Sequence, residues 1–470
     1  MKIHMLGIGG TGMGSLAGLL VEAGHTVTGT DEAIYPPMSD QLAARRIPVA
    51  EGFAAANLEP APDVVIVGNV CRPDNPEAVA LWERGLPFLS LPEALRHFFL
   101  DARQPLVVTG THGKTTTTAL LAHLLTATGQ DPSFLVGGVC RNSDATYRLG
   151  DGPAFCLEGD EYDSAFFDKA PKFLHYAPAA AVITSLEFDH ADIFASLEDI
   201  VAAFARFAAL VPTDGELWIW SGAPAAATAA QGARCPVRTY GLDGREDLHA
   251  TIDGQSAAGT RLTVRPRGGD PLVAELPLGG RHNVLNALAA LALGRAGGGD
   301  LAALVAALPT FAGVKRRQEV LGRPGGIAVI DDFAHHPTAV AETIAAVRAS
   351  HLEASGGRLW ALFEPRSNTA RRRVHQAEYA ACFTGADRVR LAAPFNPHGL
   401  PAAELLDVAD LVAVLRRAGL DAAAPGDVAA LVDDVVAGAE PGDVVLVMSN
   451  GGFGGIHGRL LARLADAAPG

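Results

Sequence analysis

Short apolar runs along the chain end in glycine, threonine or acidic residues, and segments of helical length follow them. The first run is residues 2–8 (KIHMLGI), followed by a helical segment at 13–24 and a second run at 25–31 (HTVTGTD). Runs of this length are typical of buried strands, and strands that alternate with helices favour a parallel sheet. The pattern therefore predicts a strand–helix–strand unit at the N-terminus, with 63–69 as a later strand of the same sheet.

The same alternation returns twice further along the chain. In the middle it predicts strands at 105–110, 154–160 and 180–188 and a helix at 283–297. Residues 210–280 are rich in Gly, Pro and Thr and are expected to form insertions or irregular strands. After a glycine-rich segment at 322–326, which reads as a linker, four more strands are expected at 327–333, 358–365, 386–394 and 443–452.

These patterns predict an α/β protein of three domains. A chain of 470 residues is too long for a single core. We expect an N-terminal Rossmann-like domain at 1–103, a central P-loop-type ATPase domain at 104–314 and a C-terminal Rossmann-like domain at 315–470. In sheets of this kind, ligands bind at the carboxyl ends of the strands.

Charge and cysteine content narrow the function classes. A net charge of −15 argues against nonspecific binding of nucleic acid. No apolar run is long enough to cross a bilayer, and the N-terminus does not have the form of a signal peptide. The five cysteines are scattered without a C-x-x-C pair, which argues against a structural zinc site and a disulfide framework. We therefore expect a cytoplasmic protein with no nucleic-acid or membrane partner.

A candidate phosphate loop follows the strand at 105–110. It consists of Gly110, Thr111, His112, Gly113, Lys114, Thr115 and Thr116. Backbone N–H groups and the helix dipole at such a turn face an anion, the lysine reaches the terminal phosphates and the threonine hydroxyl ligates Mg²⁺. The general pattern has a glycine five residues before Gly113, where this chain has Val108, so the loop is a shortened form. A capped helix after an ordinary turn is the alternative.

A second glycine cluster lies near the N-terminus. Gly7, Gly9 and Gly12 satisfy G-x-G-x-x-G, and Asp31 ends the next strand. Alone, this pattern indicates a nicotinamide or flavin enzyme, although the pyrophosphate of a UDP-sugar needs the same close backbone approach. The chain therefore has two glycine-rich phosphate-binding turns, or cradles, on separate sheets. This indicates an enzyme that joins two phosphorylated substrates, because an NAD-dependent oxidoreductase needs only one such cradle. The candidates for the sugar nucleotide here are Gly9, Gly10, Thr11, Gly12, Met13, Asp31 and Asn69.

Acidic residues gather after two of the central strands. "EGDEYD" contains Glu158, Asp160, Glu161 and Asp163, and "EFDHAD" contains Glu187, Asp189, His190 and Asp192. A Mg²⁺ ion that bridges the phosphates of ATP requires carboxylate ligands close to the phosphate loop. Acidic residues at strand ends beside Lys114 and Thr115 could provide them. Solvated loop acids are the alternative for any single one of them.

Further candidates follow in the second half of the chain. His282, Asn283 and Asn286 begin a helix and could hydrogen bond a base, and Lys315, Arg316 and Arg317 lie at the expected domain boundary. "DDFAHHP" supplies Asp331, Asp332, His335 and His336, for which a metal hydrolase site is the alternative. Candidates for recognition of a third substrate are Arg366, Asn368, Thr369, Ser449 and Asn450.

Six motifs occur in one order, namely "TGTHGKTTT", "EGDEYD", "EFDHAD", "HNVLNA", "GVKRR" and "DDFAHHP". In these the chain resembles the Mur ligase family along almost its whole length. That family has one domain for a UDP-sugar, one for ATP and one for the incoming amino acid or peptide, and its phosphate loop has the same short form.

The resemblance also implies roles for particular residues. It implies metal ligation by Thr115, Glu158 and His190, and catalysis by Lys114, Glu158, His190, Arg317, Asp332 and His335. ATP would contact residues 110–116 together with His282, Asn283, Asn286, Arg316, Arg317 and Asp332. The UDP-sugar would also contact His112, Glu161 and Tyr162, and the peptide would contact His336, Arg366, Asn368, Thr369, Ser449 and Asn450.

Several stretches, such as "EYDSAFFDKAPKFLHY" and "EPRSNT", resemble one branch of the family. That branch joins UDP-N-acetylmuramate to the murein tripeptide L-alanyl-γ-D-glutamyl-meso-diaminopimelate through an acyl phosphate, with ATP and Mg²⁺. The close alternative is the branch that adds L-alanine. We expect a monomer or weak homodimer.

The chain departs from the family at two places. Ser185 stands where the family usually has asparagine, which puts one contact in doubt. Many relatives use a carbamylated lysine near a second metal, whereas this chain has no lysine between Lys172 and Lys315.

Overall fold

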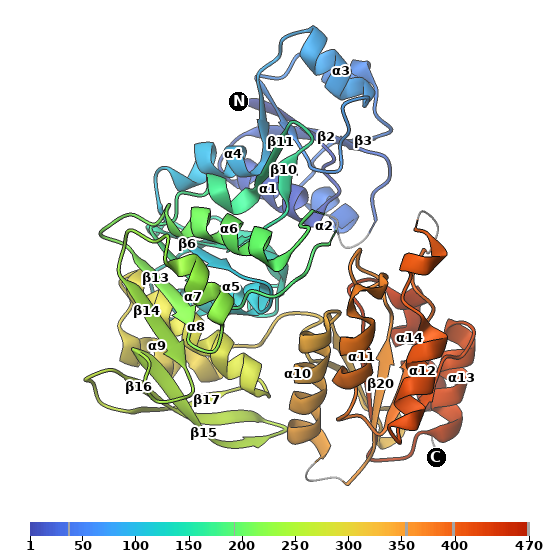
Figure 1. Cartoon of the computed structure of the whole chain (residues 1–470). Coiled ribbons are helices and arrows are strands. Elements are labelled where there is room, and N and C mark those ends of the chain that lie inside the picture. Colours follow the sequence, from blue (N-terminus) through green and yellow to red (C-terminus); the bar gives the residue numbers. More distant parts are fainter. Residues whose placement is uncertain (36–37, 192, 353–355, 397–399, 468–470) are drawn as a thin grey trace.

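The computed structural model describes residues 1–35, 38–191, 193–352, 356–396 and 400–467, so Asp192 lies outside the described residues. The described residues form three large sheets with helices on their faces, and one small two-stranded sheet (Figure 1). The blue N-terminal unit lies at one end of the central unit, and the orange and red C-terminal unit lies beside it. The expected α/β class with parallel sheets is confirmed.

The N-terminal sheet is parallel, in the order β3-β2-β1-β4-β5. Its strands are β1 (Lys2–Leu6), β2 (Thr26–Asp31), β3 (Val49–Glu51), β4 (Val64–Val67) and β5 (Phe88–Ser90). Its helices are α1 (Thr11–Glu22), α2 (Met38–Ala44), α3 (Pro76–Glu83) and α4 (Leu91–Leu95). The strand–helix–strand unit expected at 2–31 is therefore present as β1, α1 and β2.

The central sheet has ten strands in the order β17-β16-β15-β14-β13-β12-β6-β9-β7-β8. The strands are β6 (Gln104–Thr109), β7 (Ser133–Cys140), β8 (Ala145–Arg148), β9 (Ala154–Gly159), β12 (Ala180–Ile183), β13 (Glu216–Trp220), β14 (Val237–Gly241), β15 (Leu248–Ser256), β16 (Gly259–Pro266) and β17 (Leu272–Leu276). The helices are α5 (Lys114–Ala127), α6 (Leu197–Ala208), α7 (Pro224–Ala230), α8 (Arg281–Ala296) and α9 (Leu301–Ala307). A small hairpin of β10 (Asp163–Ala165) and β11 (Asp168–Pro171) stands apart from this sheet.

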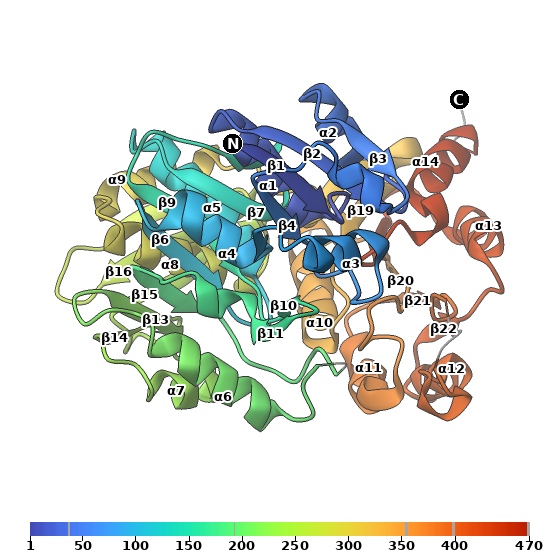
Figure 2. The same ribbon diagram turned by 90° about the horizontal axis from the view of Figure 1, so that it is seen from above.

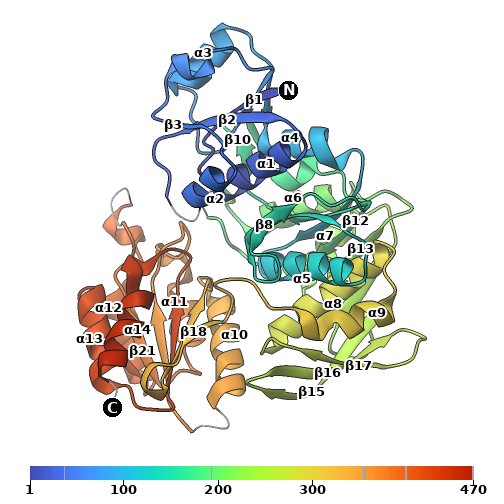
Figure 3. The same ribbon diagram turned by 180° about the vertical axis from the view of Figure 1, so that it is seen from behind.

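The N-terminal unit packs through α1 against β7 and β8 of the central sheet (Figure 3). A Cβ atom on Gly18 would lie 1.8 Å from the hydroxyl of Tyr147, so only glycine allows this approach. The hydroxyls of Ser15 and Thr146 are 2.8 Å apart in the same interface. The two units are therefore closely packed together.

The segment 248–276 is more regular than the sequence indicated. β15, β16 and β17 form an antiparallel extension of the central sheet. Their buried positions alternate, as in Leu262 and Val264, while Thr and Arg side chains between them face outward. The large share of Thr and Gly hid this period of two in the sequence.

The C-terminal sheet has the order β18-β19-β23-β20-β21-β22, and β18 is antiparallel to its neighbour. The strands are β18 (Glu319–Gly322), β19 (Ala328–Asp332), β20 (Leu359–Phe363), β21 (Arg388–Leu391), β22 (Asp421–Ala423) and β23 (Val444–Met448). The helices are α10 (Pro337–Val347), α11 (Gln376–Cys382), α12 (Val408–Arg417), α13 (Val428–Gly438) and α14 (Ile456–Asp466). The expected linker at 322–326 is instead the tip of the β18–β19 hairpin, because Gly322 pairs with Val329.

The view from above places α10 between the central unit and the rest of the C-terminal unit (Figure 2). Residues after β6, β12 and β19 meet there, at the carboxyl ends of their strands. Among the helices that the structure describes, none is long and apolar enough to cross a membrane.

Candidate functional site

The phosphate loop, residues 110–116, connects β6 to α5 and is held in a conformation that needs glycine. Gly110 and Gly113 have φ values of +129° and +82°. A Cβ on Gly113 would lie 2.2 Å from Oδ1 of Asn286. Ser185 fixes the loop from the end of β12, because its carbonyl accepts a hydrogen bond from the Thr111 amide (2.7 Å) and its hydroxyl accepts one from the His112 amide (3.3 Å). Serine at this position thus supports the loop backbone.

Lys114 lies at the first turn of α5 with its ammonium group buried beside acidic side chains. Its Nζ donates to Gly110 O (2.6 Å) and to Glu161 Oε2 (2.9 Å). His190 Nε2 is 2.8 Å from Oε1 of the same carboxylate. Burial by itself would lower the pKa of Lys114 and of His190, but the Glu161 carboxylate outweighs it and raises both pKa values. Both groups therefore favour their charged forms here.

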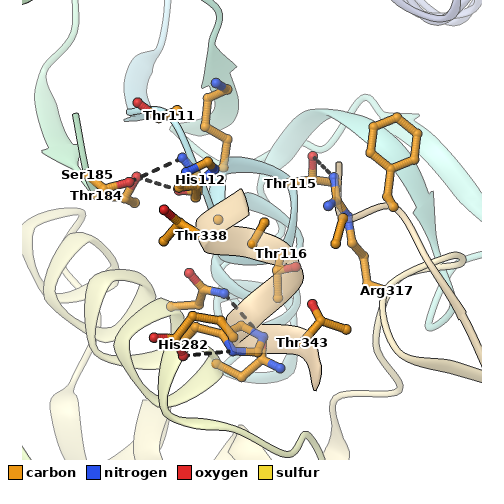
Figure 4. Close-up of a pocket in the computed structure, with 18 of the residues that line it drawn as sticks. Thr111, His112, Thr115, Thr116, Thr184, Ser185, His282, Arg317, Thr338 and Thr343 are labelled. Carbon is orange, nitrogen blue, oxygen red and sulfur yellow. Dashed lines mark hydrogen bonds and ion pairs between the residues drawn. The ribbon is translucent and has the colours of Figure 1, made fainter. Parts of the chain in front are cut away.

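Thr115 and Glu158 form a second pair deeper in the site. The Thr115 hydroxyl donates to Glu158 Oε2 over 3.1 Å, and the Gly137 amide donates to Glu158 Oε1. Burial raises the pKa of Glu158. Arg317, which follows the boundary to the C-terminal unit, donates to the Thr115 hydroxyl over 3.3 Å (Figure 4). The C-terminal unit therefore already reaches the start of α5.

A cavity of about 390 Å³ lies between the central and C-terminal units. Figure 4 shows Thr111, His112, Thr115 and His282 of the central unit around Thr338 and Thr343 of α10. Eight predicted ATP contacts line it, in addition to Thr111, His112 and Thr115, namely Gly113, Lys114, Thr116, His282, Asn283, Asn286, Arg317 and Asp332. His335, His190 and Tyr162 line it as well.

Several cavity residues were absent from the sequence-based set, among them Trp220, Tyr240, Glu342 and Thr343. They come from β13, β14 and α10, which lie far apart in the sequence. The first two are bulky aromatic side chains at strand ends, in the segment where the strand pattern was weakest. If the sequence pattern had predicted the two strands at 216–220 and 237–241, Trp220 and Tyr240 would have been recognised as residues at strand ends.

Asp332 and His335 face the cavity from the end of β19. Asp332 accepts hydrogen bonds from the amides of Gln318 (2.8 Å) and Ala334 (2.7 Å), and burial raises its pKa. His335 donates from Nδ1 to Phe333 O (3.0 Å), and burial lowers its pKa. Arg316 instead bonds to groups of its own unit, namely Asp331 Oδ2 (3.1 Å) and the carbonyls of Ser449 and Gly451 (both 2.7 Å).

Three of the residues expected to hold the peptide line a second cavity, of about 420 Å³: Arg366, Asn368 and Asn450. The Arg366 guanidinium lies 3.6 Å from the ring centroid of Phe395, another lining residue. Thr369 and Ser449 are buried, and Ser449 donates to Glu364. His336 is the N-cap of α10 and is not among the lining residues of either described cavity. Sequence reasoning missed Arg371, Phe395 and Asn396.

The N-terminal residues expected to hold the UDP-sugar lie at the carboxyl end of the N-terminal sheet, whereas His112, Glu161 and Tyr162 belong to the central unit. Gly10 is the N-cap of α1, and Thr11, Gly12 and Met13 form its first turn. The Gly9 amide donates to Asp31 Oδ2 over 2.7 Å, so Asp31 supports the glycine turn from the end of β2. Asn69 donates to Asp163 of the β10–β11 hairpin over 2.8 Å, which joins this edge to the central unit.

Comparison with known proteins identifies the family. Models of the Mur ligase family, catalytic domain, the Mur ligase middle domain and the Mur ligase, glutamate ligase domain match residues 2–103, 108–294 and 316–451. The chain belongs to the Mur ligase family. Membership of the Mur ligases favours the ligase interpretation of the two glycine cradles over a nicotinamide oxidoreductase.

Particular Mur ligases are similar to this chain over most of its length. The UDP-N-acetylmuramate–L-alanyl-γ-D-glutamyl-meso-2,6-diaminoheptandioate ligase of Escherichia coli is 40% identical and covers 100% of this chain and 99% of its own. A UDP-N-acetylmuramate–L-alanine ligase of Rubrobacter xylanophilus is 37% identical over 85% of this chain and 86% of its own. The crystal structure of a murein peptide ligase from Psychrobacter arcticus superposes with a TM-score of 0.72, at 36% identity and 99% coverage of both chains.

Proposed function

We propose that this Mur ligase joins the lactyl carboxylate of UDP-N-acetylmuramate to the murein tripeptide L-alanyl-γ-D-glutamyl-meso-diaminopimelate, at the expense of ATP, in peptidoglycan recycling. The observation that carries this proposal is the 40% identity over the whole chain to the Escherichia coli ligase of that specificity. The geometry supports it, because the cavity beside the phosphate loop and the arginine-lined second cavity adjoin each other and share Tyr162 and Asn450 as lining residues.

The proposal assigns the three substrates to three domains. Residues 1–103 would bind the UDP-sugar, residues 104–314 would bind ATP, and residues 315–470 would bind the peptide. His282, Asn283 and Asn286 would hold the base of ATP, because they line the cavity beside the phosphate loop. Arg366, Asn368 and Asn450 would hold the peptide, because they line the second cavity.

In the first step, an oxygen of the lactyl carboxylate attacks the γ-phosphorus of ATP. The bond between this phosphorus and the β,γ-bridging oxygen breaks. The products are an acyl phosphate and ADP, and ADP is the leaving group. In the second step, the peptide α-amine attacks the acyl carbon and phosphate leaves as the amide forms. Both partners of the first step are anions, so charge neutralisation and alignment are the main contributions. Lys114 and Arg317 face the cavity with the positive charges this requires.

Thr115, Glu158 and His190 would hold Mg²⁺, which would neutralise phosphate charge. The buried pair of Glu158 and the Thr115 hydroxyl fits a hard cation, because both groups offer oxygen ligands. Burial raises the pKa of Glu158, so a cation bound beside it would stabilise its ionised form. His190 is bonded to Glu161 in this structure, so it would exchange that partner for the ion.

L-Alanine is the second candidate for the amine substrate, because the Rubrobacter relative is named as an L-alanine ligase. The test is phosphate release from ATP with UDP-N-acetylmuramate and either tripeptide or L-alanine. We expect a kcat/KM at least about 100-fold higher with tripeptide, about 2.7 kcal/mol of discrimination. Faster turnover with L-alanine would refute the tripeptide assignment.

We also propose that the reaction takes place in the cytoplasm, by a monomer or weak homodimer. All five cysteines are free and buried, which suits a reducing compartment.

A further inference from the structure

Three side chains from distant parts of the sequence converge at the boundary between the central and C-terminal units. His112 belongs to the phosphate loop, Glu187 follows β12, and His336 is the N-cap of α10. Nε2 of His112 lies 3.4 Å from Glu187 Oε2, and Nδ1 of His336 lies 3.5 Å from the same oxygen. One donor atom from each residue can be chosen so that all three lie within 4.8 Å of one another.

These separations match the geometry of a four-coordinate metal ion. Zinc binds histidine nitrogen and carboxylate oxygen at about 2.0–2.2 Å, so the donors of a tetrahedral site stand about 3.3–3.6 Å apart. Two of the three donor pairs already have that spacing. The third pair consists of the two imidazole nitrogens of His112 and His336, which come from different units. These two nitrogens would have to move slightly closer together to reach that spacing.

His336 is weakly bonded for a buried imidazole. Its side chain is 7% exposed, and its Nε2 has no hydrogen-bond partner among the residues that the structure describes. Its Nδ1 accepts a long hydrogen bond of 3.3 Å from the Thr338 amide. Nδ1 is the nitrogen that faces Glu187, so a metal ion bound there would replace one long hydrogen bond of His336.

A further hydrogen bond orients the carboxylate of this cluster. The Thr338 hydroxyl donates to Glu187 over 2.6 Å and fixes the direction of that carboxylate.

We propose that His112, Glu187 and His336 form a binding site for a divalent transition-metal ion such as Zn²⁺, distinct from the Mg²⁺ ligands Thr115, Glu158 and His190. Two imidazoles and one carboxylate favour Zn²⁺ and its neighbours over Mg²⁺, which prefers oxygen ligands. An ion bound there links the phosphate loop to α10 and so holds the central and C-terminal units together. The inference rests on this cluster and does not depend on the choice of amine substrate.

The test is metal binding by the full-length protein, stripped of metal and free of nucleotide. Titration with Co²⁺, followed by its visible absorption, and with Zn²⁺, followed by calorimetry, should show one ion per chain with the intense bands of tetrahedral coordination. Excess Mg²⁺ should not displace it. His336→Gln and His112→Gln should each weaken binding at least about tenfold. Absence of a tetrahedral ion in the wild type would overturn the proposal.

Two further variants keep the result interpretable. His123→Gln is the matched control, because His123 hydrogen bonds Thr310 and packs on Phe311 at the side of α5, and it should bind the ion as the wild type does. Lys114→Ala should lose ligase activity and keep the ion, so failure of the metal site and failure of the proposed function give different results. His112→Gln changes a partly exposed loop side chain, so wild-type affinity in that variant would refute the site even if His336→Gln does not fold.

Discussion

At the scale of single residues, the ammonium of Lys114 is balanced by a buried carboxylate. Glu161 is 3% exposed and accepts from both Lys114 and His190. The proposed mechanism needs this ammonium on the phosphates of ATP, so the lysine must be able to exchange one anion for another. Lys114 is the first residue of α5, and its side chain lines the cavity proposed for ATP.

Replacing Lys114 with alanine is therefore expected to abolish ADP formation and also to lower stability by about 3 kcal/mol, since a buried carboxylate loses its cation. Activity is measured as ADP release and stability by urea unfolding. The double variant Lys114→Ala/Glu161→Gln should recover part of the stability and none of the activity. Retained ADP release in the single variant would contradict the role of Lys114.

His335 gives a prediction for pH. Burial lowers its pKa in the folded state below the ordinary value of 6.5, so the unfolded chain binds a proton more readily. Its contribution to stability is complete above pH 6.5 and is lost as the pH falls below it, by at most about 1.4 kcal/mol per pH unit. His335→Gln should thus flatten the decline in unfolding free energy between about pH 6.5 and 5, and an unchanged slope would refute this assignment.

At the scale of the element, α5 has a glycine of positive φ near each end. Gly113 (φ +82°) is its N-cap beside Asn286, and Gly129 (φ +80°) follows its last turn, where an added Cβ would meet no atom within 4 Å. Alanine at either site adds backbone strain of about 1–2 kcal/mol. Of the two substitutions, Gly113→Ala also adds a close contact with Asn286 and disturbs the loop.

We expect Gly113→Ala to destabilise the protein by more than Gly129→Ala and to weaken ATP binding at least about tenfold, about 1.4 kcal/mol. Thermal unfolding and calorimetric titration with ATP measure the two effects. Equal ATP affinity in both variants would show that the turn at Gly113 does not shape the nucleotide site.

Elements with a strong local pattern could be predicted from the sequence, and sites assembled from distant segments could not. Apolar runs ending in functional residues marked β1, β6, β9, β19 and β23 correctly, because buried parallel strands are apolar on both faces. By contrast, the grouping of His112 with His336 depends on how two units pack, and no local spacing encodes it. The same holds for Trp220 and Tyr240.

At the scale of the whole molecule, two nearby residues make contacts across the units, one with a buried residue and one with an exposed residue. Arg317 reaches Thr115 at the start of α5, whereas Lys315 pairs with the exposed carboxylate of Asp144. In the proposed mechanism Arg317 completes the site only when the units meet, and a residue of that kind contributes mainly to the transition state.

Arg317→Ala should lower kcat about 100- to 1,000-fold, measured by steady-state phosphate release. Lys315→Ala should change kcat little, because exposed ion pairs contribute about 0–1 kcal/mol. Similar losses in both variants would indicate a general effect of charge at this boundary.

The contact of Gly18 with Tyr147 determines which parts of the chain can be produced separately. A truncated chain containing only the first sheet and its helices would present the glycine face of α1 to solvent with no aromatic ring to cover it. Such a fragment should aggregate, whereas one extending through α9 retains both sides of that contact. Screening for sugar-nucleotide ligands is therefore best done on the longer fragment.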